Sequence, residues 1–234
     1  MKENSPQISV VIPVLNEEKY IKKVLTHIKK NARSGRILEI LVVDGGSTDA
    51  TVAIAISLGA TVISSDRGRA RQMNLGAKMA AGELLYFLHV DTIPPLNFDT
   101  DILNSYVNGF EAGCFRLQFD TSHPVLRFFA WCSRMNYQIC RGGDQSLFIS
   151  KNLFLRSGKF NESYIIYEDN EFIGRLYKLA NFTIIPTAVK TSARRYRQKG
   201  IFTLQYHFGV VHLKHYLGTG PEALYSYYKK HIAV

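Results

Sequence analysis

The part of the chain up to about residue 95 alternates short apolar runs with helical periodicity, and this alternation limits the possible folds most. Each apolar run is too short for a helix and is typical of a buried strand in an α/β sheet. After the first run, apolar residues recur at helical spacing from Ile21 to Ile28, which indicates an amphipathic helix facing the sheet. Strands that alternate with helices form a parallel, doubly wound sheet. The expected strands are residues 8–14, 37–43, 61–63 and 83–92.

The regular alternation stops after Pro95. No linker is visible, so we expect one domain over residues 1–234. Its nucleotide-binding half would span about 1–95, its acceptor half about 96–200 and its C-terminal helices about 201–234. In the acceptor half the sequence predicts strands at 113–119 and 146–150 and helices at 98–107, 124–140 and 167–180.

The net charge of +10 favours anionic partners such as a nucleoside diphosphate, a phosphorylated acceptor, nucleic acid or a membrane surface. A basic, solvated surface is the alternative. The three cysteines form no C-x-x-C pair, which argues against a disulfide framework or a cysteine zinc site. No apolar signal-peptide core follows Met1, and no apolar run is long enough to span a bilayer. We therefore expect a cytoplasmic protein, attached at most to the inner face of the membrane.

Several common nucleotide and hydrolase motifs are absent: G-x-G-x-x-G after the first strand, the P-loop and the G-x-S-x-G elbow. Polar side chains instead stand at the ends of three of the expected strands: Glu17, Asp44, and the pair His89 and Asp91. Ligands of open α/β sheets bind outside the carboxyl ends of the strands. In extended backbone, the spacing of His89 and Asp91 puts both on one side. We therefore predict that they hold a divalent metal against the phosphates of a nucleotide.

Four groups of residues resemble, in order, the motifs of family 2 glycosyltransferases with the GT-A fold. This fold has a Rossmann-like, mostly parallel sheet flanked by helices. The resemblance covers roughly residues 8–180 and implies an inverting, metal-dependent transfer of a sugar from a UDP- or GDP-sugar to a small-molecule or lipid-linked acceptor. The variant His-x-Asp, where the family usually has Asp-x-Asp, is similar to a bacterial subgroup linked to arsenosugar biosynthesis. The motifs are residues 9–18, 42–51, 69–76 with 81–83, and 158–162 followed by 168–169.

The resemblance implies that Pro13, Leu15 and Glu17 line the nucleoside pocket and that Asp44 contacts the base. An alternative for Asp44 is a turn-forming role, because Gly45 follows it directly.

Two pairs of arginines are candidates for the diphosphate. Arg69 and Arg71 stand where positive donors are needed, with Arg71 favoured, although the family often has an arginine at the position of Met73. A solvated, basic helix start is the alternative. Arg194 and Arg195 come after the acidic pair Glu168-Asp169, at a place where several members of the family have an arginine-aromatic motif. They would close over the diphosphate or hold an anionic acceptor. A solvated loop is an equal alternative there.

For the metal, the resemblance assigns direct binding to Asp91, while the position of His89 often contacts ribose or a metal-bound water. A neutral imidazole at His89 suits Mn²⁺ better than Mg²⁺ and must lose its proton to bind, so activity would fall in acid. A pseudoenzyme that lost its metal is the alternative. His207, His212 and His215 are candidates for a further ligand, although helical histidines more often pack.

The resemblance makes Asp169 the base that removes the proton of the acceptor hydroxyl, with Glu168 as its neighbour. Acidic residues in a first helical turn also stabilise the helix dipole, which is the alternative. The sequence offers no recognisable nucleic-acid-binding element, so nucleic acid is not the expected partner. The aromatic and basic stretch from Tyr225 to Lys230 either lies on an anionic membrane or packs on the domain.

Overall fold

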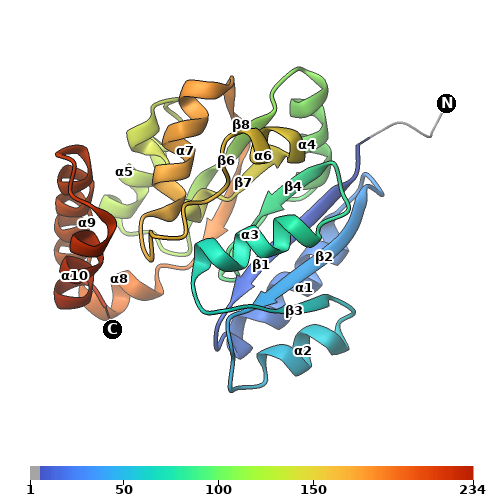
Figure 1. Cartoon of the computed structure of the whole chain (residues 1–234), viewed down its shortest axis with the longest axis horizontal. Coiled ribbons are helices and arrows are strands. Elements are labelled where there is room, and N and C mark those ends of the chain that lie inside the picture. Colours follow the sequence, from blue (N-terminus) through green and yellow to red (C-terminus); the bar gives the residue numbers. More distant parts are fainter. Residues whose placement is uncertain (1–5, 234) are drawn as a thin grey trace.

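The computed structural model describes residues 6–233, in which one eight-stranded sheet is flanked by helices on both faces (Figure 1). The strand order is β3-β2-β1-β4-β7-β6-β8-β5. The first four strands in this order are parallel, β7 is antiparallel to both neighbours, and β6 and β8 are parallel to each other. The strands are β1 (Ile8–Val14), β2 (Ile37–Asp44), β3 (Thr61–Ser64), β4 (Leu84–Phe87), β5 (Thr92–Ile93), β6 (Ala112–Phe119), β7 (Leu147–Ser150) and β8 (Phe182–Thr191).

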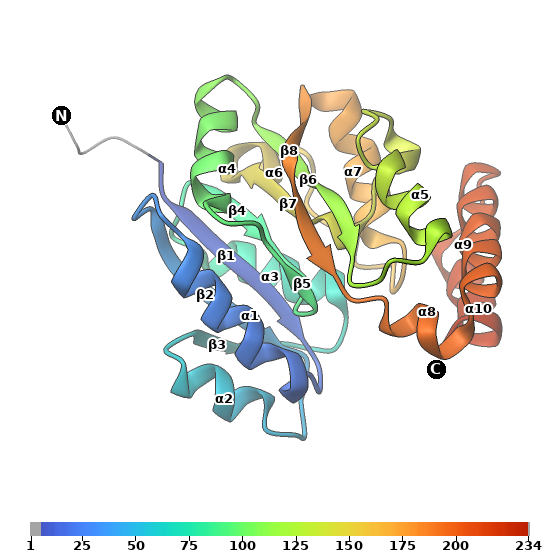
Figure 2. The same ribbon diagram turned by 180° about the vertical axis from the view of Figure 1, so that it is seen from behind.

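Two apolar cores lie on opposite faces of the sheet. Helices α1, α2 and α4 contribute to one core, and α3, α6 and α7 contribute to the other. The last two helices, α9 and α10, pack against each other at one end of the molecule (Figures 1 and 2). No helix within residues 6–233 is long and apolar enough to cross a membrane. The helices are α1 (Glu18–Asn31), α2 (Thr51–Ser57), α3 (Arg69–Met79), α4 (Phe98–Val107), α5 (Pro124–Cys132), α6 (Lys151–Arg156), α7 (Glu168–Leu179), α8 (Arg194–Lys199), α9 (Ile201–Tyr216) and α10 (Pro221–His231).

Strand β1 shows why the sheet forms, because all seven of its residues are buried. Val10 and Ile12 face one core and Val11 faces the other, as the alternation of side chains along a strand requires. The predicted amphipathic helix is α1, in which Ile21 and Ile28 are at most 1% exposed. The α/β class and the first three expected strands are therefore confirmed, and the fourth is present over a shorter range.

The carboxyl ends of β2, β1 and β4 lie side by side, because these strands are parallel neighbours. The loops after β1 and β2 are tied together: the backbone N–H of Thr48 donates to Asn16 Oδ1 at 2.8 Å, and Thr51 Oγ1 accepts from the N–H of Glu17 at 2.8 Å. The polar strand ends predicted from the sequence are therefore brought to one edge of the sheet.

The expectation of one extended strand through residues 83–92 is wrong. β4 ends at Phe87, where its pairing with both neighbouring strands ends, and the N–H of Thr92 donates to the carbonyl of His89 at 3.0 Å. His89 and Asp91 therefore lie in a turn. Their positions are set by this turn and by their side-chain partners instead of by strand periodicity.

The second half of the chain departs further from the prediction. The helix expected over 124–140 ends at Cys132 as α5, and α6 was not expected. Strand β8 was also not expected, because Pro186 interrupts its apolar pattern. In the pairing of β6 with β8, Phe115 is opposite Ile185 and the next residue, Arg116, is opposite Ala188. Pro186 therefore lies in a β-bulge, where the N–H that proline lacks is not needed for pairing.

Helix α3 packs closely on the sheet through a glycine, and this gives a stability prediction. A Cβ atom on Gly76 would lie 2.4 Å from Val11 Cγ1 and 3.0 Å from Val43 Cγ2. We expect Gly76→Ala to lower the free energy of unfolding by about 1–3 kcal/mol through overpacking. The matched control is Gly209→Ala in α9, where a Cβ meets nothing within 4 Å. That variant should gain about 0.5–1 kcal/mol, and urea unfolding distinguishes the two; equal stabilities would contradict the packing argument.

Candidate active site

His89 lies between two carboxylates at the ends of the parallel strands. Its Nε2 is 3.5 Å from Asp169 Oδ2, and its Nδ1 is 3.6 Å from Asp144 Oδ1. Burial of the ring acts to lower its pKa, but Asp144 and Asp169 outweigh this effect and raise the pKa of His89 to about 10. The imidazole is therefore protonated at neutral pH in this structure, and it links the turn after β4 to the start of α7.

Helix α7 begins with the acidic pair, and Arg69, the first residue of α3, lies against it. Arg69 Nη1 is 3.0 Å from Glu168 Oε1 and 4.0 Å from Asp169 Oδ2. Glu168 is only 1% exposed, and within residues 6–233 no group donates a hydrogen bond to its carboxylate. Burial raises the pKa of Glu168, although Arg69 acts in the opposite direction. Arg69 is thus the main counter-charge of this buried acid.

Arg71, which the sequence favoured over Arg69, lies away from the acidic pair. Its Nε is 3.9 Å from Glu162 Oε2, and both side chains are about half exposed. The structure therefore brings Arg69 next to Asp169 and not Arg71. Which of the two arginines binds a diphosphate stays a prediction.

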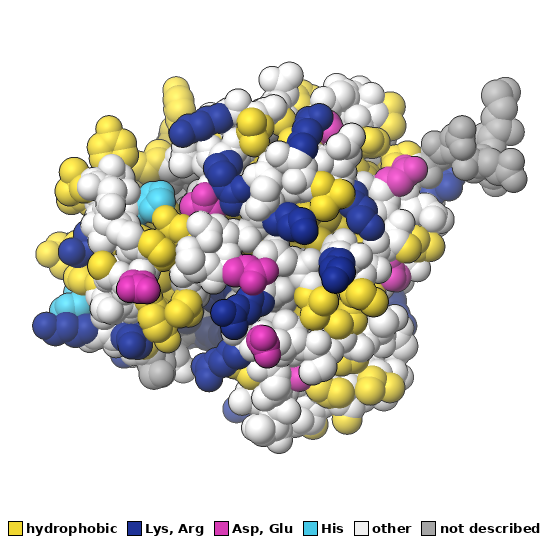
Figure 3. All heavy atoms as spheres, viewed as in Figure 1, with side chains coloured by type: hydrophobic (Ala, Val, Ile, Leu, Met, Phe, Trp, Pro, Cys, Tyr) yellow, Lys and Arg dark blue, Asp and Glu magenta, His cyan; other side chains and the backbone are white. Residues whose placement is uncertain are grey.

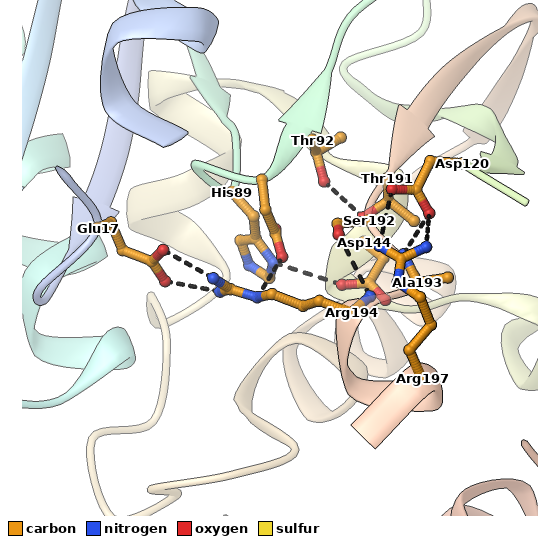
Figure 4. Close-up of polar contacts among 11 residues, drawn as sticks. Glu17, His89, Thr92, Asp120, Asp144, Thr191, Ser192, Ala193, Arg194 and Arg197 are labelled. Carbon is orange, nitrogen blue, oxygen red and sulfur yellow. Dashed lines mark hydrogen bonds and ion pairs between the residues drawn. The ribbon is translucent and has the colours of Figure 1, made fainter. Parts of the chain in front are cut away.

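Arg194, at the start of α8, joins the ends of β1 and β4 (Figure 4). It donates two hydrogen bonds to Glu17, from Nη1 to Oε2 at 2.8 Å and from Nη2 to Oε1 at 2.6 Å, and its Nε is 3.3 Å from Asp91 Oδ2. Its guanidinium also lies 4.6 Å from the ring centre of Tyr20. Burial and the nearby Asp144 raise the pKa of Asp91, against the opposing effect of Arg194. A positive charge therefore already sits between these two carboxylates.

Arg195 takes a different direction from Arg194. It donates to the hydroxyl of Tyr228 on α10, and its guanidinium lies 5.8 Å from the ring centre of Phe208. Of the two predicted arginines, the structure thus brings Arg194 to the strand ends and packs Arg195 among the C-terminal helices.

The predicted nucleoside residues lie at or just beyond the carboxyl ends of β1 and β2. Pro13 is buried within β1, whereas Leu15 and Glu17 lie beyond its end and are half buried. Asp44 is 6% exposed, and its Oδ2 accepts the N–H groups of Gly46 at 3.1 Å and Ser47 at 3.0 Å. The turn-forming role of Asp44 is therefore observed, and contact with a base stays a prediction.

The protein alone supplies few metal ligands. Within residues 6–233, no group of three or more His, Cys, Asp or Glu side chains is arranged to hold an ion. Asp91 fits a cation, because its carboxylate already faces a positive group, the guanidinium of Arg194. The remaining ligands would have to come from a nucleotide and water, as is common for Mg²⁺-type sites.

The C-terminal histidines are engaged in packing contacts. His212 Nδ1 lies 2.7 Å from the hydroxyl of Tyr167, and His207 Nδ1 lies 2.7 Å from the hydroxyl of Tyr227. The ring of His215 lies 4.6 Å from that of Tyr167. The packing interpretation thus accounts for all three, as it does for Tyr227.

Sequence reasoning missed the loop before β7. Asp144 pairs with His89, and Gly143 lets the backbone approach Asp169: a Cβ atom on Gly143 would lie 2.0 Å from Asp169 Oδ2 and 2.7 Å from His89 Cε1. The sequence feature that could have indicated this role is the run Gly142-Gly143-Asp144 shortly before a strand. We interpreted this run only as a loop.

This close approach gives a prediction for activity. We expect Gly143→Ala to displace the carboxylate of Asp169 and to lower turnover about 100-fold, with little change in the unfolding midpoint. The matched control is Gly142→Ala, because Gly142 has extended backbone (φ −168°) and a Cβ there meets nothing within 4 Å. Initial rates of both variants test this, and similar losses in both would contradict it.

The arginine-rich motif of α3 also positions the site. Gln72 donates from Nε2 to the carbonyls of Val14 and Val43, at the ends of β1 and β2. Asn74 donates to the carbonyl of Phe160 at 2.9 Å and accepts its N–H at 3.1 Å. These side chains fix α3, and with it Arg69, to the sheet and to the loop before α7.

Comparison with known proteins identifies the family. Residues 9–160, well over half of the chain, match the family model described as Glycosyl transferase family 2. The chain belongs to this family. It is 36% identical over 99 residues to glucosyl-3-phosphoglycerate synthase of Mycobacterium tuberculosis (strain ATCC 25618 / H37Rv), covering 38% of this chain and 30% of that protein. It is 33% identical over 101 residues to glycosyltransferase AglE of Haloferax volcanii, covering 40% and 33%. These matches span about a third of the length of each relative.

Solved structures show the same fold. Mannosyltransferase PcManGT from Pyrobaculum calidifontis, in complex with GDP-Man and Mn²⁺, gives a TM-score of 0.72 at 17% identity, covering 97% of this chain and 70% of that one. S. aureus TarS in complex with UDP-GlcNAc gives a TM-score of 0.66 at 20% identity, covering 80% and 58%. At these identities the likeness establishes the fold, which is that of GT-A glycosyltransferases, as the sequence predicted.

Proposed function

We propose that this family 2 protein is an inverting glycosyltransferase that uses a nucleoside-diphosphate sugar and a divalent metal. The observation that carries the proposal is the position of Asp169. The first turn of α7 brings its carboxylate beside His89, in the turn after β4, and beside Arg69 at the start of α3. This carboxylate is 13% exposed, so it is held in place and still accessible to a substrate.

Each charged residue has a task in this reaction. Asp169 takes the proton of the acceptor hydroxyl while the hydroxyl oxygen attacks the anomeric carbon, and the bond to the diphosphate breaks. Arg69 and Arg194 face the developing negative charge of the leaving diphosphate. Glu17, just beyond β1, and Asp44, the last residue of β2, would face the nucleoside. Inversion follows because the hydroxyl enters on the face opposite the departing diphosphate.

The proposed metal would be held by Asp91, with His89 as its neighbour. When bound, the ion neutralises the diphosphate of the donor. We expect Mn²⁺ to serve better than Mg²⁺, because an imidazole stands where the family usually has a carboxylate. Since His89 is protonated in this structure, it must lose that proton before it can act as a ligand. PcManGT binds GDP-Man together with Mn²⁺, which supports this pairing of donor and ion.

A thermal-shift panel tests the donor site. UDP, GDP and their sugars are each added with and without Mn²⁺, and Mn²⁺ is also added alone. Because the protein supplies few ligands, we expect Mn²⁺ alone to leave the melting temperature unchanged. A matching nucleotide with Mn²⁺ at 100 times its dissociation constant should raise it by about 5–10 °C. No shift with any nucleoside diphosphate, with or without the metal, would contradict the proposal.

A further inference from the structure

A hollow lies apart from the cluster around His89 and is lined by residues of α5, β6 and β8. Figure 2 shows α5 beside β6. Its volume is about 760 Å³, and it is open to solvent. Side chains from β6, the loop after β6, α5 and β8 line it. The ones used below are Arg116, Asp120, Arg127, Trp131, Arg134 and Lys190. We refer to this hollow as the α5 groove.

The α5 groove is strongly basic. Three arginines and one lysine line it, and Asp120 is the one carboxylate among the lining residues that the structure describes. That carboxylate is already occupied, because it accepts the N–H of Ala193 at 2.7 Å and two hydrogen bonds from Arg197 at 3.1 Å. The groove therefore keeps a net positive charge that its own acid does not neutralise.

The groove arginines have no partners within residues 6–233. The side chains of Arg116, Arg127 and Arg134 take part in no hydrogen bond or ion pair there, and the Nε of Arg116 is buried without an acceptor. A buried donor without a partner is costly, and like charges gathered in one hollow repel one another. Both costs disappear when an anion with several acceptor oxygens occupies the groove. A phosphate group has this chemistry and the geometry that guanidinium groups prefer.

An apolar surface adjoins these cations. Phe128, Phe129 and Trp131 on α5 are 58%, 40% and 54% exposed, and their rings are in contact, with centroids 5.7 Å apart for the two phenylalanines and 6.4 Å apart for Phe128 and Trp131. Trp131 belongs both to this aromatic group and to the lining of the groove. Figure 3 shows hydrophobic side chains gathered at the edge of the molecule where α5 and α9 lie in Figure 1. A ligand with an apolar body beside its anionic group would cover both features.

We infer that the α5 groove binds a phosphate monoester carried on an apolar chain, with the phosphate on the arginines and the chain on the aromatic group. Such a ligand is either a soluble alkyl or prenyl phosphate or a phosphate headgroup at a bilayer surface. The groove also adjoins the proposed donor site. Asp120 accepts a hydrogen bond from the N–H of Ala193, and the next residue, Arg194, binds Glu17 (Figure 4). The Nε of Arg194 also lies 3.3 Å from Asp91. Binding of this ligand to the groove does not depend on the proposed function. The further step, that the ligand is the acceptor of the sugar, does rest on it.

Trp131 is the only tryptophan of the chain, so its fluorescence reports on the groove without a label. The probes are octyl phosphate, inorganic phosphate and octanol. We expect octyl phosphate to shift the emission to the blue and to bind at least about tenfold more tightly than inorganic phosphate, because its chain covers exposed rings. Octanol should bind weakly. Equal affinities for octyl phosphate and inorganic phosphate, or no binding of either, would overturn the inference.

Charge reversal in the groove gives the matched comparison. Arg127→Glu with Arg134→Glu should weaken octyl phosphate binding by at least about tenfold. Lys22→Glu with Lys23→Glu, on the exposed side of α1, changes the net charge equally and should leave binding intact. Equal losses in both double variants would mean that only net charge matters, and the inference would be wrong.

Further experiments distinguish a soluble ligand from a bilayer headgroup, and both of these from nucleic acid. Co-sedimentation with phosphatidylcholine vesicles containing phosphatidic acid, and not with phosphatidylcholine alone, identifies a bilayer source, whereas octyl phosphate binding without co-sedimentation identifies a soluble one. A single-stranded oligonucleotide that displaces octyl phosphate and binds more tightly would replace the inference with nucleic-acid binding. The groove variant should keep the melting-temperature shift produced by nucleotide and Mn²⁺. If the groove variant loses octyl phosphate binding but keeps this melting-temperature shift, the groove and the donor site are separate, and each hypothesis can fail without the other.

Discussion

Replacing Asp169 with asparagine is expected to lower sugar transfer by about 10²–10⁴-fold while nucleotide affinity stays nearly unchanged. Asparagine keeps the size of the side chain but cannot take a proton from the acceptor hydroxyl. The carboxylate lies beside His89 and Arg69, and within residues 6–233 it accepts no backbone hydrogen bond that holds α7, so its loss should not unfold the helix. The effect should therefore appear in kcat and not in the affinity for the donor.

Steady-state kinetics and the thermal-shift panel measure these two quantities separately. Glu162→Gln is the matched control, because Glu162 is half exposed and its arginine partner, Arg71, lies away from the acidic pair. Glu168→Gln is a useful second comparison. Glu168 is almost fully buried and faces Arg69, so its removal should act on stability and on the position of Arg69 rather than on proton transfer. A rate for Asp169→Asn within tenfold of the wild type would place the base elsewhere.

The parts of the site that sequence could predict are those that local patterns determine. Glu17 and Asp44 stand at the carboxyl ends of apolar strands that neighbour each other in the sheet, so their place at one edge follows from the parallel α/β arrangement. Asp169 was named as a candidate because it stands in a family motif, and the structure places it in the first turn of a helix, as the sequence predicted. In these cases a residue and the element that positions it are adjacent in the chain.

The parts that sequence missed depend on distant partners. Arg194 binds Glu17 across 177 positions, and no local pattern specifies which of two adjacent arginines makes that contact. His89 and Asp91 were placed by strand periodicity, yet the chain turns there because the pairing of β4 ends at Phe87. Asp144 gains its importance only from a pairing with His89 that the fold creates. Tertiary contacts decide these positions, and local propensity does not.

Replacing Asp91 with asparagine is the second change for which we expect a large effect, a loss of metal-dependent nucleotide binding. The variant keeps the shape of the side chain but removes the negative charge that would hold the ion. Arg194 should remain in place, because its two hydrogen bonds to Glu17 do not involve Asp91. The fold and the approach to the strand ends should therefore be preserved, while the proposed cation would lose the carboxylate assigned to hold it.

The expected loss of affinity for UDP or GDP in the presence of Mn²⁺ is at least about 100-fold. Removing a residue that only hydrogen-bonds to a metal ligand already costs up to about 100-fold, and removing the ligand itself should cost no less. Binding without Mn²⁺ should stay the same or become slightly stronger, because a negative charge facing the diphosphate is removed. Calorimetric titrations with and without Mn²⁺ measure both quantities, with Asp66→Asn on the exposed loop before α3 as the control. If Mn²⁺ increases the nucleotide affinity of Asp91→Asn as much as that of the wild type, Asp91 does not hold the ion. The same result would remove the link between the turn after β4 and the diphosphate on which the proposed reaction depends.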